Sequence, residues 1–197
     1  IKKIGEISSN AIGKMRYEGA GTIEFLYENN NFFFIEMNTR LQVEHPITEA
    51  VFGVDLVKEQ ISVASGAGLS FSQESLKSKG HAIECRINAE RLPTFSPSPG
   101  NIKEFHSPGG IGIRMDSAIY NGFKVPPHYD SLIGKLIVHA DNRPMAIRRL
   151  ARALDELIID GIYTTVDLFK EILDEENFKS GEYNIHWLEN WLADRVQ

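Results

Sequence analysis

The sequence predicts an α+β fold, and three observations lead to this class. Short runs of residues typical of β-strands occur in both halves of the chain. Apolar residues at helical spacing occur between these runs and at both ends. The stretch 65–80 is rich in Ser and Gly and follows neither period, so we place a domain boundary there. The predicted domains span residues 1–72 and 81–190.

The composition narrows the class of protein further. The chain has 197 residues, 42% of them hydrophobic, and a net charge of −6, which suits one or two ordered domains and argues against nucleic acid as the main partner. No apolar run approaches the ~20 residues that a membrane span requires. For that reason we expect no membrane partner. The single cysteine cannot form an internal disulfide, so we expect a reducing, cytoplasmic setting. Because the first residue is Ile1, we expect that part of the protein upstream is missing.

The first predicted domain contains helices on either side of a β-hairpin. Apolar spacing predicts a helix over residues 1–18, and a second helical pattern covers 47–64 with a break at Gly53. Between them, Thr22–Tyr27 and Phe32–Met37 read as strands joined by a polar loop of about three residues.

The second predicted domain mixes strands and helices. His81–Glu90 alternates as a strand should, and residues 91–100 hold three prolines, which predicts a rigid loop. Further strands are expected near 101–106, 110–116 and 132–139. One helix is expected from Asn142 until Gly161 closes it, and two more over about 165–174 and 185–193.

The hairpin has a predicted register with a chemical consequence. Centring the loop on Asn30 places three pairs opposite each other: Glu24 with Glu36, Leu26 with Phe34, and Glu28 with Phe32. Two opposed carboxylates repel each other unless a cation lies between them. The pattern therefore indicates a cation site on the face that carries Glu24 and Glu36.

The densest polar cluster of the chain follows this hairpin, from Glu36 to Pro46. Its carboxylate and amide oxygens suit Mg²⁺ or Mn²⁺. Arg40 offers a planar fork for a small oxyanion such as bicarbonate, and Glu44 is placed to accept a proton. A solvated surface loop is the alternative that composition leaves open.

These residues carry a resemblance to a known family. The segment Glu36–Glu49, EMNTRLQVEHPITE, resembles the signature segment of biotin carboxylases, which are ATP-grasp enzymes that carboxylate biotin on a carrier protein. Similar segments are found at Gly19–Phe25, Glu84–Glu90, Ser96–Gly100 and Tyr129–Lys135. The resemblance implies the C-terminal portion of an ATP-grasp fold followed by a biotin carboxylase C-terminal domain. It also implies that the ATP-binding front half is absent, so we expect this chain alone to be inactive.

The resemblance also assigns roles to individual positions. The two Mg²⁺ or Mn²⁺ ions that hold ATP would be bound by Glu24, Glu36 and Asn38, and the adenine would contact Leu26 and Ile185. Bicarbonate would be surrounded by Arg40, Gln42, Val43 and Arg86, and Glu44 would take its proton. Arg86 would also face the biotin ureido oxygen. The implied catalytic residues are Arg40, Glu44 and Arg86.

The implied reaction is the ATP-dependent carboxylation of biotin with bicarbonate through carboxyphosphate. It would be the first half-reaction of a bacterial acetyl-CoA carboxylase in fatty acid synthesis, with biotin carboxyl carrier protein and carboxyltransferase subunits as partners. The region of Ile111 and Arg114 matches the family's two-fold contact, which implies a homodimer.

Alternatives remain at this point. The chain could belong to a propionyl-CoA, methylcrotonyl-CoA or pyruvate carboxylase, or it could be a non-enzymatic dimerisation or carrier-docking module. Single residues also have structural interpretations: Cys85 as a core side chain, Trp187 and Trp191 as core anchors, and Lys135 as a member of an ion pair.

Overall fold

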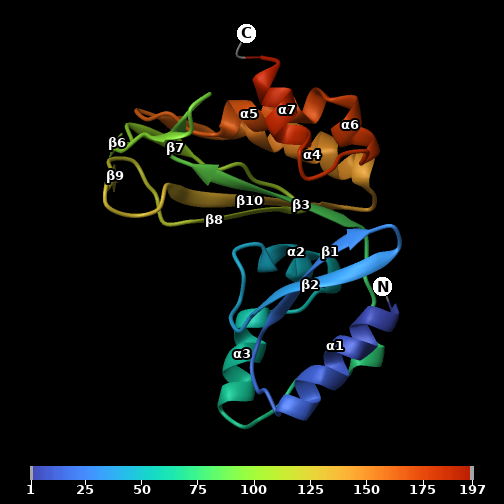
Figure 1. The fold of residues 1–197 in the computed structure, drawn as a ribbon. Helices are drawn as coiled ribbons and strands as arrows, with labels where there is room; N and C mark the ends of the chain where they lie inside the picture. The colour runs from blue at the N-terminus through green and yellow to red at the C-terminus, as the bar shows by residue number, and fades with distance from the viewer. Residues whose placement is uncertain (1, 196–197) are drawn as a thin grey trace. The chain divides into compact units, whose positions relative to one another are not determined.

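A computed structural model describes residues 2–195, which fold into two compact units. Of the described residues, 2–78 belong to the first unit and 79–195 to the second (Figure 1). Within residues 2–195, we find no helix that has both the length and the apolar character needed to cross a membrane.

The first unit is built from three α-helices and a hairpin: α1 (Lys2–Met15), β1 (Thr22–Glu28), β2 (Asn31–Asn38), α2 (His45–Phe52) and α3 (Leu56–Ala64), with a 3₁₀ turn η1 at Gln73–Ser75. The helix α1 is shorter than expected, because Arg16 turns to a positive φ of 52° directly after Met15. The predicted break at Gly53 is confirmed, since Gly53 adopts the left-handed conformation at φ 69° that ends α2. Asp55 then begins α3 by accepting a 2.8 Å hydrogen bond from the Lys58 amide.

The hairpin register is confirmed at its chemically important end and wrong at the other. Glu24 lies opposite Glu36 as predicted, but a β-bulge follows, and beyond it Leu26 lies opposite Phe33 instead of Phe34, and Glu28 opposite Asn31 instead of Phe32. The loop has two residues, Asn29 and Asn30, with φ of 49° and 61°. Positive φ at both positions is what a type I′ hairpin turn requires, and asparagine tolerates it. This shorter loop and the bulge compensate each other, which restores the predicted pairing at Glu24.

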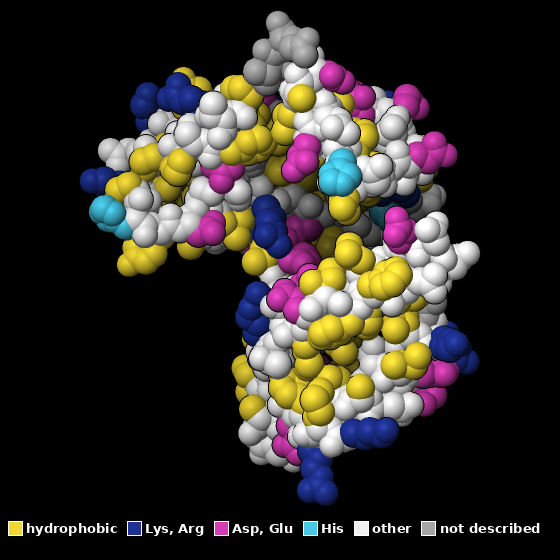
Figure 2. All heavy atoms as spheres, in the orientation of Figure 1, with side chains coloured by type: hydrophobic (Ala, Val, Ile, Leu, Met, Phe, Trp, Pro, Cys, Tyr) yellow, Lys and Arg dark blue, Asp and Glu magenta, His cyan; other side chains and the backbone are white. Residues whose placement is uncertain are grey.

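The apolar side chains of this hairpin are unusually exposed. Leu26, Tyr27, Phe33, Phe34 and Ile35 each expose between 50% and 65% of their surface. In the space-filling view, hydrophobic side chains are spread over the surface of the unit that carries the hairpin (Figure 2). An exposed apolar sheet of this kind normally belongs to an interface with another part of a protein.

The second unit is a three-stranded antiparallel sheet with helices on one face. The sheet has the order β3 (His81–Asn88), β10 (Leu132–Ala140) and β8 (Ile113–Ser117). The helix α4 (Arg143–Glu156) packs on β10 and β3, and α5 (Val166–Asp174) and α6 (Glu176–Ser180) pack on α4 (Figure 1). The helix α7 (Trp187–Ala193) completes this layer. Short strand pairs surround the sheet: β4 (Glu90–Arg91) with β5 (Ser96–Pro97), β6 (Gly100–Asn101) with β9 (Lys124–Val125), and β7 (Glu104–His106) with β11 (Ile158–Asp160).

The core of this unit lies between the sheet and α4. Leu136 on β10 and Leu150 and Leu154 on α4 are at most 1% exposed. Asn142 caps α4 by accepting a hydrogen bond from the Met145 amide, as the expected helix start at that residue requires. Cys85 is buried in the same core, as predicted, and its burial raises the pKa of the thiol to about 12.

Several expectations for the second unit are wrong in detail. The helix expected to continue to Gly161 ends at Glu156, because Ile158 and Ile159 pair as strand β11 with β7. Both residues are β-branched, so strand pairing is favourable for them even though their spacing continues the helical stripe. The region 91–100, expected as a loop, contributes to the strand pairs β4–β5 and β6–β9. Residues 176–180 form α6, which the sequence did not indicate.

Candidate active site

Two carboxylates face each other across the hairpin of the first unit. Glu24 and Glu36 are direct cross-strand partners. The Asn38 side-chain amide donates to Oε1 of both, at 2.9 Å to Glu24 and 3.0 Å to Glu36. The Gln42 amide donates a second hydrogen bond to Glu24 Oε1 at 2.6 Å. Neutral amides therefore stabilise a like-charged pair that would otherwise repel.

The donor set of this cluster fits a hard divalent cation. Carboxylate and amide oxygens are the ligands that Mg²⁺ prefers, and this ion normally keeps water or phosphate oxygens as further ligands. The Asn38 nitrogen bridges the two carboxylates where a shared cation would lie, while Asn38 Oδ1 accepts a 3.3 Å hydrogen bond from Arg40. Among residues 2–195, groups of three or more His, Cys, Asp and Glu side chains suited to a metal are not found. A metal site here would consist of two carboxylates and one amide, with the Asn38 oxygen turned toward the ion.

A cavity of about 600 Å³ adjoins this cluster within the first unit. Arg40, Gln42 and Glu44 line it on one side, and the segment Gly19–Thr22 lines it on another. Gly21 packs closely in this geometry, because a Cβ there would lie 3.0 Å from Met37 Cε and 3.3 Å from the Asn38 carbonyl oxygen, so these neighbours would have to shift by a few tenths of an ångström to admit one. The cavity thus combines a cation, an amide and a carboxylate in a space suited to a small anion.

The loop that forms this cavity is held by local hydrogen bonds. The Arg40 guanidinium donates to the Leu41 carbonyl oxygen at 3.2 Å, and His45 Nδ1 lies 2.7 Å from the Gln42 carbonyl oxygen. Glu44 is the N-cap residue of α2, and Pro46 lies in the first turn of that helix. A carboxylate at this position is favoured by the helix dipole. For His45 a structural role was expected, and the structure places it in the cavity wall.

Two other predicted residues of this unit are not among the described residues that line the cavity. Val43 is partly buried. Leu26 is half-exposed on β1, two residues from Glu24 along the strand, so both side chains point to one face. Their predicted contacts with bicarbonate and adenine remain predictions.

In the second unit, Arg86 lies in a row of charged residues. The strand register places Arg86 opposite Lys135, and Lys135 opposite Asp116 on the far strand. Lys135 Nζ is 3.7 Å from Asp116 Oδ2, and Arg114 holds the same carboxylate through two hydrogen bonds of 2.7 and 2.8 Å. Two cations on directly opposed strand positions raise the positive potential at Arg86.

Sequence reasoning missed the neighbourhood of Arg86. For Lys135, structural pairing was expected at least as much as substrate contact, and the structure shows an ion pair with Asp116. Its position beside Arg86 follows from the pairing of strands β3 and β10. The signal was available, since both strands were predicted, but no register was derived for them. Ile185, the other predicted residue of this unit, lies between α6 and α7 and is 78% exposed.

Comparison with known proteins places this geometry in a family. Residues 84–190 match the model of the biotin carboxylase C-terminal domain, and residues 1–72 match the ATP-binding domain of the carbamoyl-phosphate synthase L chain. A biotin carboxylase of Haemophilus influenzae is 59% identical over 192 residues, which are 98% of this chain and 43% of that protein. A pyruvate carboxylase subunit of Methanothermobacter thermautotrophicus is 52% identical over 191 residues, which are 96% of this chain and 39% of that protein.

Solved structures give the same result. The biotin carboxylase domain of a thermophilic 2-oxoglutarate carboxylase bound to bicarbonate superposes with a TM-score of 0.93 at 43% identity, covering 96% of this chain and 43% of that one. A biotin carboxylase from Campylobacter jejuni in a nucleotide complex gives 0.92 at 47% identity, covering 96% of this chain and 42% of that one. The chain spans about two fifths of the length of these relatives. By sequence and by fold, the chain therefore belongs to the biotin carboxylase family.

Proposed function

We propose that the protein containing this chain uses ATP and bicarbonate to carboxylate biotin on a carrier protein. The observation that carries the proposal is the opposed pair Glu24 and Glu36, bridged by Asn38, next to a cavity lined by Arg40, Gln42 and Glu44. A related biotin carboxylase domain, 43% identical to this chain, forms a dimer in complex with MgADP, ADP and bicarbonate. The chemistry of the two clusters suits these ligands.

Glu24, Glu36 and Asn38 would hold Mg²⁺ or Mn²⁺ together with the ATP phosphates. Such ions, when bound, neutralise the charge that develops on the transferred phosphoryl group. The protein's own contribution is to keep two carboxylates opposed at a fixed strand register, so that the ligand oxygens are already in place. Leu26 on the same strand, and Ile185 from the second unit, would contact the adenine.

Arg40, Gln42 and Glu44 would bind and activate bicarbonate in the adjoining cavity, with Val43 between them in the sequence. Bicarbonate is a poor nucleophile until it loses its proton, and the Glu44 carboxylate is placed to accept that proton. An oxygen of the deprotonated anion would then bond to the γ-phosphorus of ATP as ADP leaves, forming carboxyphosphate. Arg40 would hold the doubly charged anion while this happens.

Arg86 would act in the second step, when biotin captures the CO₂ released from carboxyphosphate. Carboxyphosphate breaks down to CO₂ and phosphate, and the phosphate would take the ureido proton as the nitrogen bonds to CO₂. The negative charge that develops on the biotin oxygen would be stabilised by the guanidinium beside it. Lys135, opposite Arg86 on the neighbouring strand, would strengthen the positive potential there.

Within this family, we propose that the protein is a separate biotin carboxylase subunit, working in the cytoplasm for a bacterial acetyl-CoA carboxylase. Identity is 59% to a biotin carboxylase of Haemophilus influenzae but 35% to a multifunctional pyruvate carboxylase of Rhizobium etli. The 52% identity to the Methanothermobacter pyruvate carboxylase protein makes that enzyme the second candidate. The exposed side chain of Ile111, with Arg114 nearby on β8, would form the homodimer contact.

The experiment is bicarbonate-dependent ATP cleavage with free biotin by the longest reading frame that contains this chain. We expect Glu44→Gln to abolish ATP cleavage, because the bicarbonate proton then has no acceptor. Arg86→Ala should reduce carboxybiotin formation at least tenfold more than ATP cleavage, since it acts after phosphoryl transfer. The matched controls Glu6→Gln on α1 and Arg148→Ala on α4, both exposed, should keep full activity.

Each alternative gives a different result. Addition of carboxyltransferase subunits with either acetyl-CoA or pyruvate identifies the acyl acceptor. If the longest reading frame neither binds nor cleaves ATP, and carrier protein docks to it equally well without nucleotide, the enzyme proposal fails. A dimerisation or carrier-docking module then replaces it.

A further inference from the structure

Arg143 occupies a position that its own helix does not favour. It is the first residue of α4, directly after the N-cap residue Asn142. The positive end of the helix dipole lies there, so a cation at this position is unfavourable for α4 itself. The contacts that Arg143 makes lie instead with β3 and with the end of α6.

The guanidinium of Arg143 is bound to the carboxyl end of α6. Its Nη2 donates to the Phe178 carbonyl oxygen, and its Nε donates to the Lys179 carbonyl oxygen at 3.3 Å. Its Nη1 lies 3.3 Å from His81 Nε2 on β3, which accepts the bond because a guanidinium carries donors only. The last carbonyl groups of a helix lack intrahelical partners and favour a cation, so these contacts stabilise the end of α6.

The turn after α6 leaves these carbonyl groups for Arg143. Gly181 ends α6 in the left-handed conformation at φ 81°, and its amide donates to the Asn177 carbonyl oxygen at 3.0 Å. The Glu182 amide donates to the same oxygen at 2.9 Å, and a longer bond of 3.3 Å joins the Gly181 amide to the Phe178 oxygen. The backbone of the turn thus uses mainly Asn177, and Arg143 binds the next two carbonyl groups.

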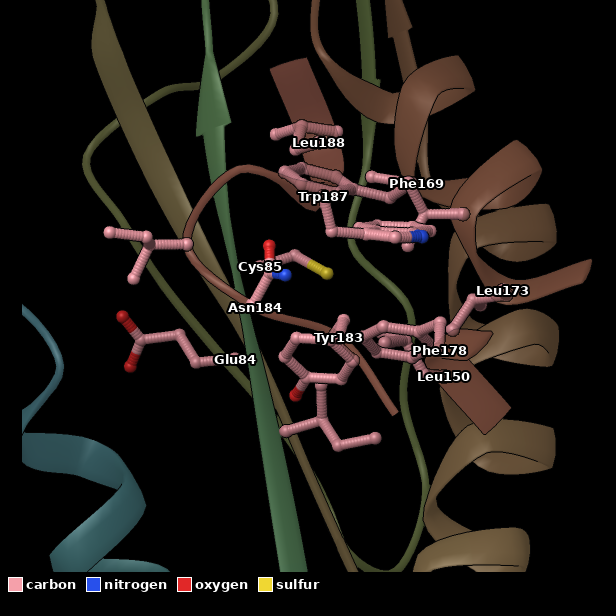
Figure 3. A pocket seen from close by; sticks show the side chains of 13 residues that line it. Glu84, Cys85, Leu150, Phe169, Leu173, Phe178, Tyr183, Asn184, Trp187 and Leu188 are labelled. Atoms are coloured by element: carbon pink, nitrogen blue, oxygen red, sulfur yellow. The ribbon is translucent and has the colours of Figure 1, made fainter. Parts of the chain in front are cut away.

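A row of aromatic rings connects this end of α6 to the segment that follows it. The Arg143 guanidinium lies 4.7 Å from the Phe178 ring centroid. Phe178 stacks on Tyr183 with the ring centroids 5.9 Å apart and an interplanar angle of 14°. Trp187 follows Tyr183 at 6.0 Å (Figure 3). The segment Tyr183–Trp187 therefore has an anchored ring at each end.

Ile185 lies in the middle of this segment, and its side chain is mostly exposed. The segment turns sharply, because the His186 amide donates to Asn184 Oδ1 at 2.9 Å and the Trp187 amide donates to the Asn184 carbonyl oxygen at 3.1 Å. An apolar cavity of about 280 Å³, which Ile185 lines, lies between the segment and β3 (Figure 3). Since a cavity lies beneath the segment in place of packed side chains, its conformation depends on the anchors at its ends.

We propose that Arg143 is a positioning residue, which fixes the end of α6 and the rings beyond it and thereby holds Ile185 where the adenine of ATP would bind. This inference rests on the adenine contact proposed for Ile185, and it adds a residue that need not touch the nucleotide. Arginine suits this role better than lysine does. Its planar fork binds two carbonyl groups and His81 together while it stacks on a ring, whereas a lysine ammonium is a compact point charge.

Steady-state kinetics of the longest reading frame that contains this chain test the proposal. Arg143→Met keeps an unbranched side chain and removes the hydrogen bonds to α6. We expect the KM for ATP to rise at least about fivefold, while kcat and the KM for bicarbonate change less than about twofold, because the loss is confined to nucleotide binding. Arg143→Lys should recover part of the loss, since it keeps a cation near Phe178. Arg148→Met, exposed on the same helix, is the matched control and should leave every constant unchanged.

Hydrogen exchange of the 197-residue chain gives a readout that needs no nucleotide. Amides of residues 181–188 should exchange at least about tenfold faster in Arg143→Met, whereas those of β10 should keep their native protection. Unchanged exchange of 181–188, or faster exchange with an unchanged KM for ATP, overturns the proposal. A native protein that cleaves no ATP counts against the proposed function, whereas a native protein that cleaves ATP, with an unchanged KM in Arg143→Met, counts against Arg143 alone.

A second pair of variants covers the case in which Arg143→Met does not fold. Tyr183→Leu leaves the hydrogen bonds of Arg143 in place and removes the ring that joins α6 to the segment. It should raise the KM for ATP with little change in kcat. Adding Arg143→Lys to Tyr183→Leu should then have no further effect, because both changes break the same connection. An unchanged KM in Tyr183→Leu, or effects that multiply in the double variant, would contradict a connection through these rings.

Discussion

The two units of this chain differ most in what lies at their centres. In the second unit, the side chains of Ile87, Leu136 and Leu154 are fully withdrawn from water between a sheet and a helix. Over residues 2–78, the buried residues are Pro46, Glu49 and Glu59, of which two are charged. The second unit is thus stabilised by a hydrophobic core, whereas the first depends on strand pairing and polar capping.

The carboxylates of the first unit show how such capping works. Glu49 accepts a 2.8 Å hydrogen bond from the Leu56 amide at the start of α3, and Glu59 accepts hydrogen bonds from the amide and hydroxyl of Ser70. These contacts order backbone but bury little apolar surface. Because burial of apolar surface is the main driving force of folding, we infer that the first unit is the less stable of the two.

The units resemble each other in one respect. Each places like charges on cross-strand partners, Glu24 with Glu36 in the first and Arg86 with Lys135 in the second. Such pairs oppose folding slightly and favour binding of the opposite charge. The cation site and the anion site that we propose thus share one arrangement, like charges on cross-strand partners, in two different sheets.

Hydrogen exchange of the whole chain should show the largest difference between the units. Amides of β10, the central strand of the core, should exchange at least about a hundredfold more slowly than amides of β1 and β2, because they open only when the second unit unfolds. Mass spectrometry of deuterium uptake by peptide fragments measures this. Equal protection in both units would show that the exposed hairpin is as stable as the buried sheet.

Matched truncations test the role of the core. Leu154→Ala should reduce the free energy of unfolding by about 3–5 kcal/mol, because it leaves a cavity in a tightly packed site. Leu26→Ala, the same change at a half-exposed position of the hairpin, should alter it by less than about 1 kcal/mol. Urea unfolding followed by circular dichroism gives both values, and similar losses for the two variants would contradict the contrast.

Neutralising one carboxylate of the pair Glu24 and Glu36 should change both stability and Mg²⁺ binding. The change in stability should be smaller than that caused by the core truncation. Glu36→Gln removes the repulsion with Glu24 and should stabilise the hairpin by up to about 1 kcal/mol in the absence of divalent ions. The same change should weaken Mg²⁺ binding at least tenfold, because one of two carboxylate ligands is lost. Unfolding with and without Mg²⁺ measures both, with Glu28→Gln as the control at the far end of the strand. A loss of stability without Mg²⁺ would show that the pair does not repel.

Acidification should have the smallest effect, and it separates the units by pH. Burial and the neighbouring Arg143 lower the pKa of His81 below its ordinary value near 6.5, so its contribution to stability is complete above pH 6.5 and is lost as the pH falls below that value. Hydrogen bonds from Ser70 lower the pKa of Glu59, so the first unit loses this contribution only below about pH 4.5.

Unfolding midpoints measured from pH 8 down to about pH 2 would follow both losses. His81→Gln should remove the loss near pH 6 and leave the one at lower pH. If the midpoint of His81→Gln falls between pH 7 and pH 5.5 as much as that of the native chain, His81 is not responsible.

Much of this architecture could be predicted from the sequence because the decisive signals are local. Two β-type runs, Thr22–Tyr27 and Phe32–Met37, around a polar stretch predicted the hairpin, and Gly53 marked the break between α2 and α3. The Glu24–Glu36 pair followed from the hairpin alone. The predicted roles of the polar cluster came from resemblance to a family, since a set of polar residues does not by itself distinguish a site from a solvated loop.

The features that could not be predicted depend on contacts between residues distant in sequence, which compete with local preferences. The bulge after Glu24 has no sequence signal of its own, and it changed the partners of Leu26 and Glu28. Ile158 continues a helical stripe, yet pairing with β7 is more favourable for it than another helical turn. The position of Lys135 beside Arg86 required the register of two strands that are distant in sequence.

The stacked pair Trp187 and Trp191 gives this molecule a built-in optical signal. These are the two tryptophans of the chain, and their rings lie 6.0 Å apart at an interplanar angle of 26°. Indole chromophores at that separation couple electronically, so circular dichroism will show a paired band, and its loss marks the unwinding of α7, the helix that carries both rings. Because the first unit contains no tryptophan in its sequence, the band reports on the second unit alone.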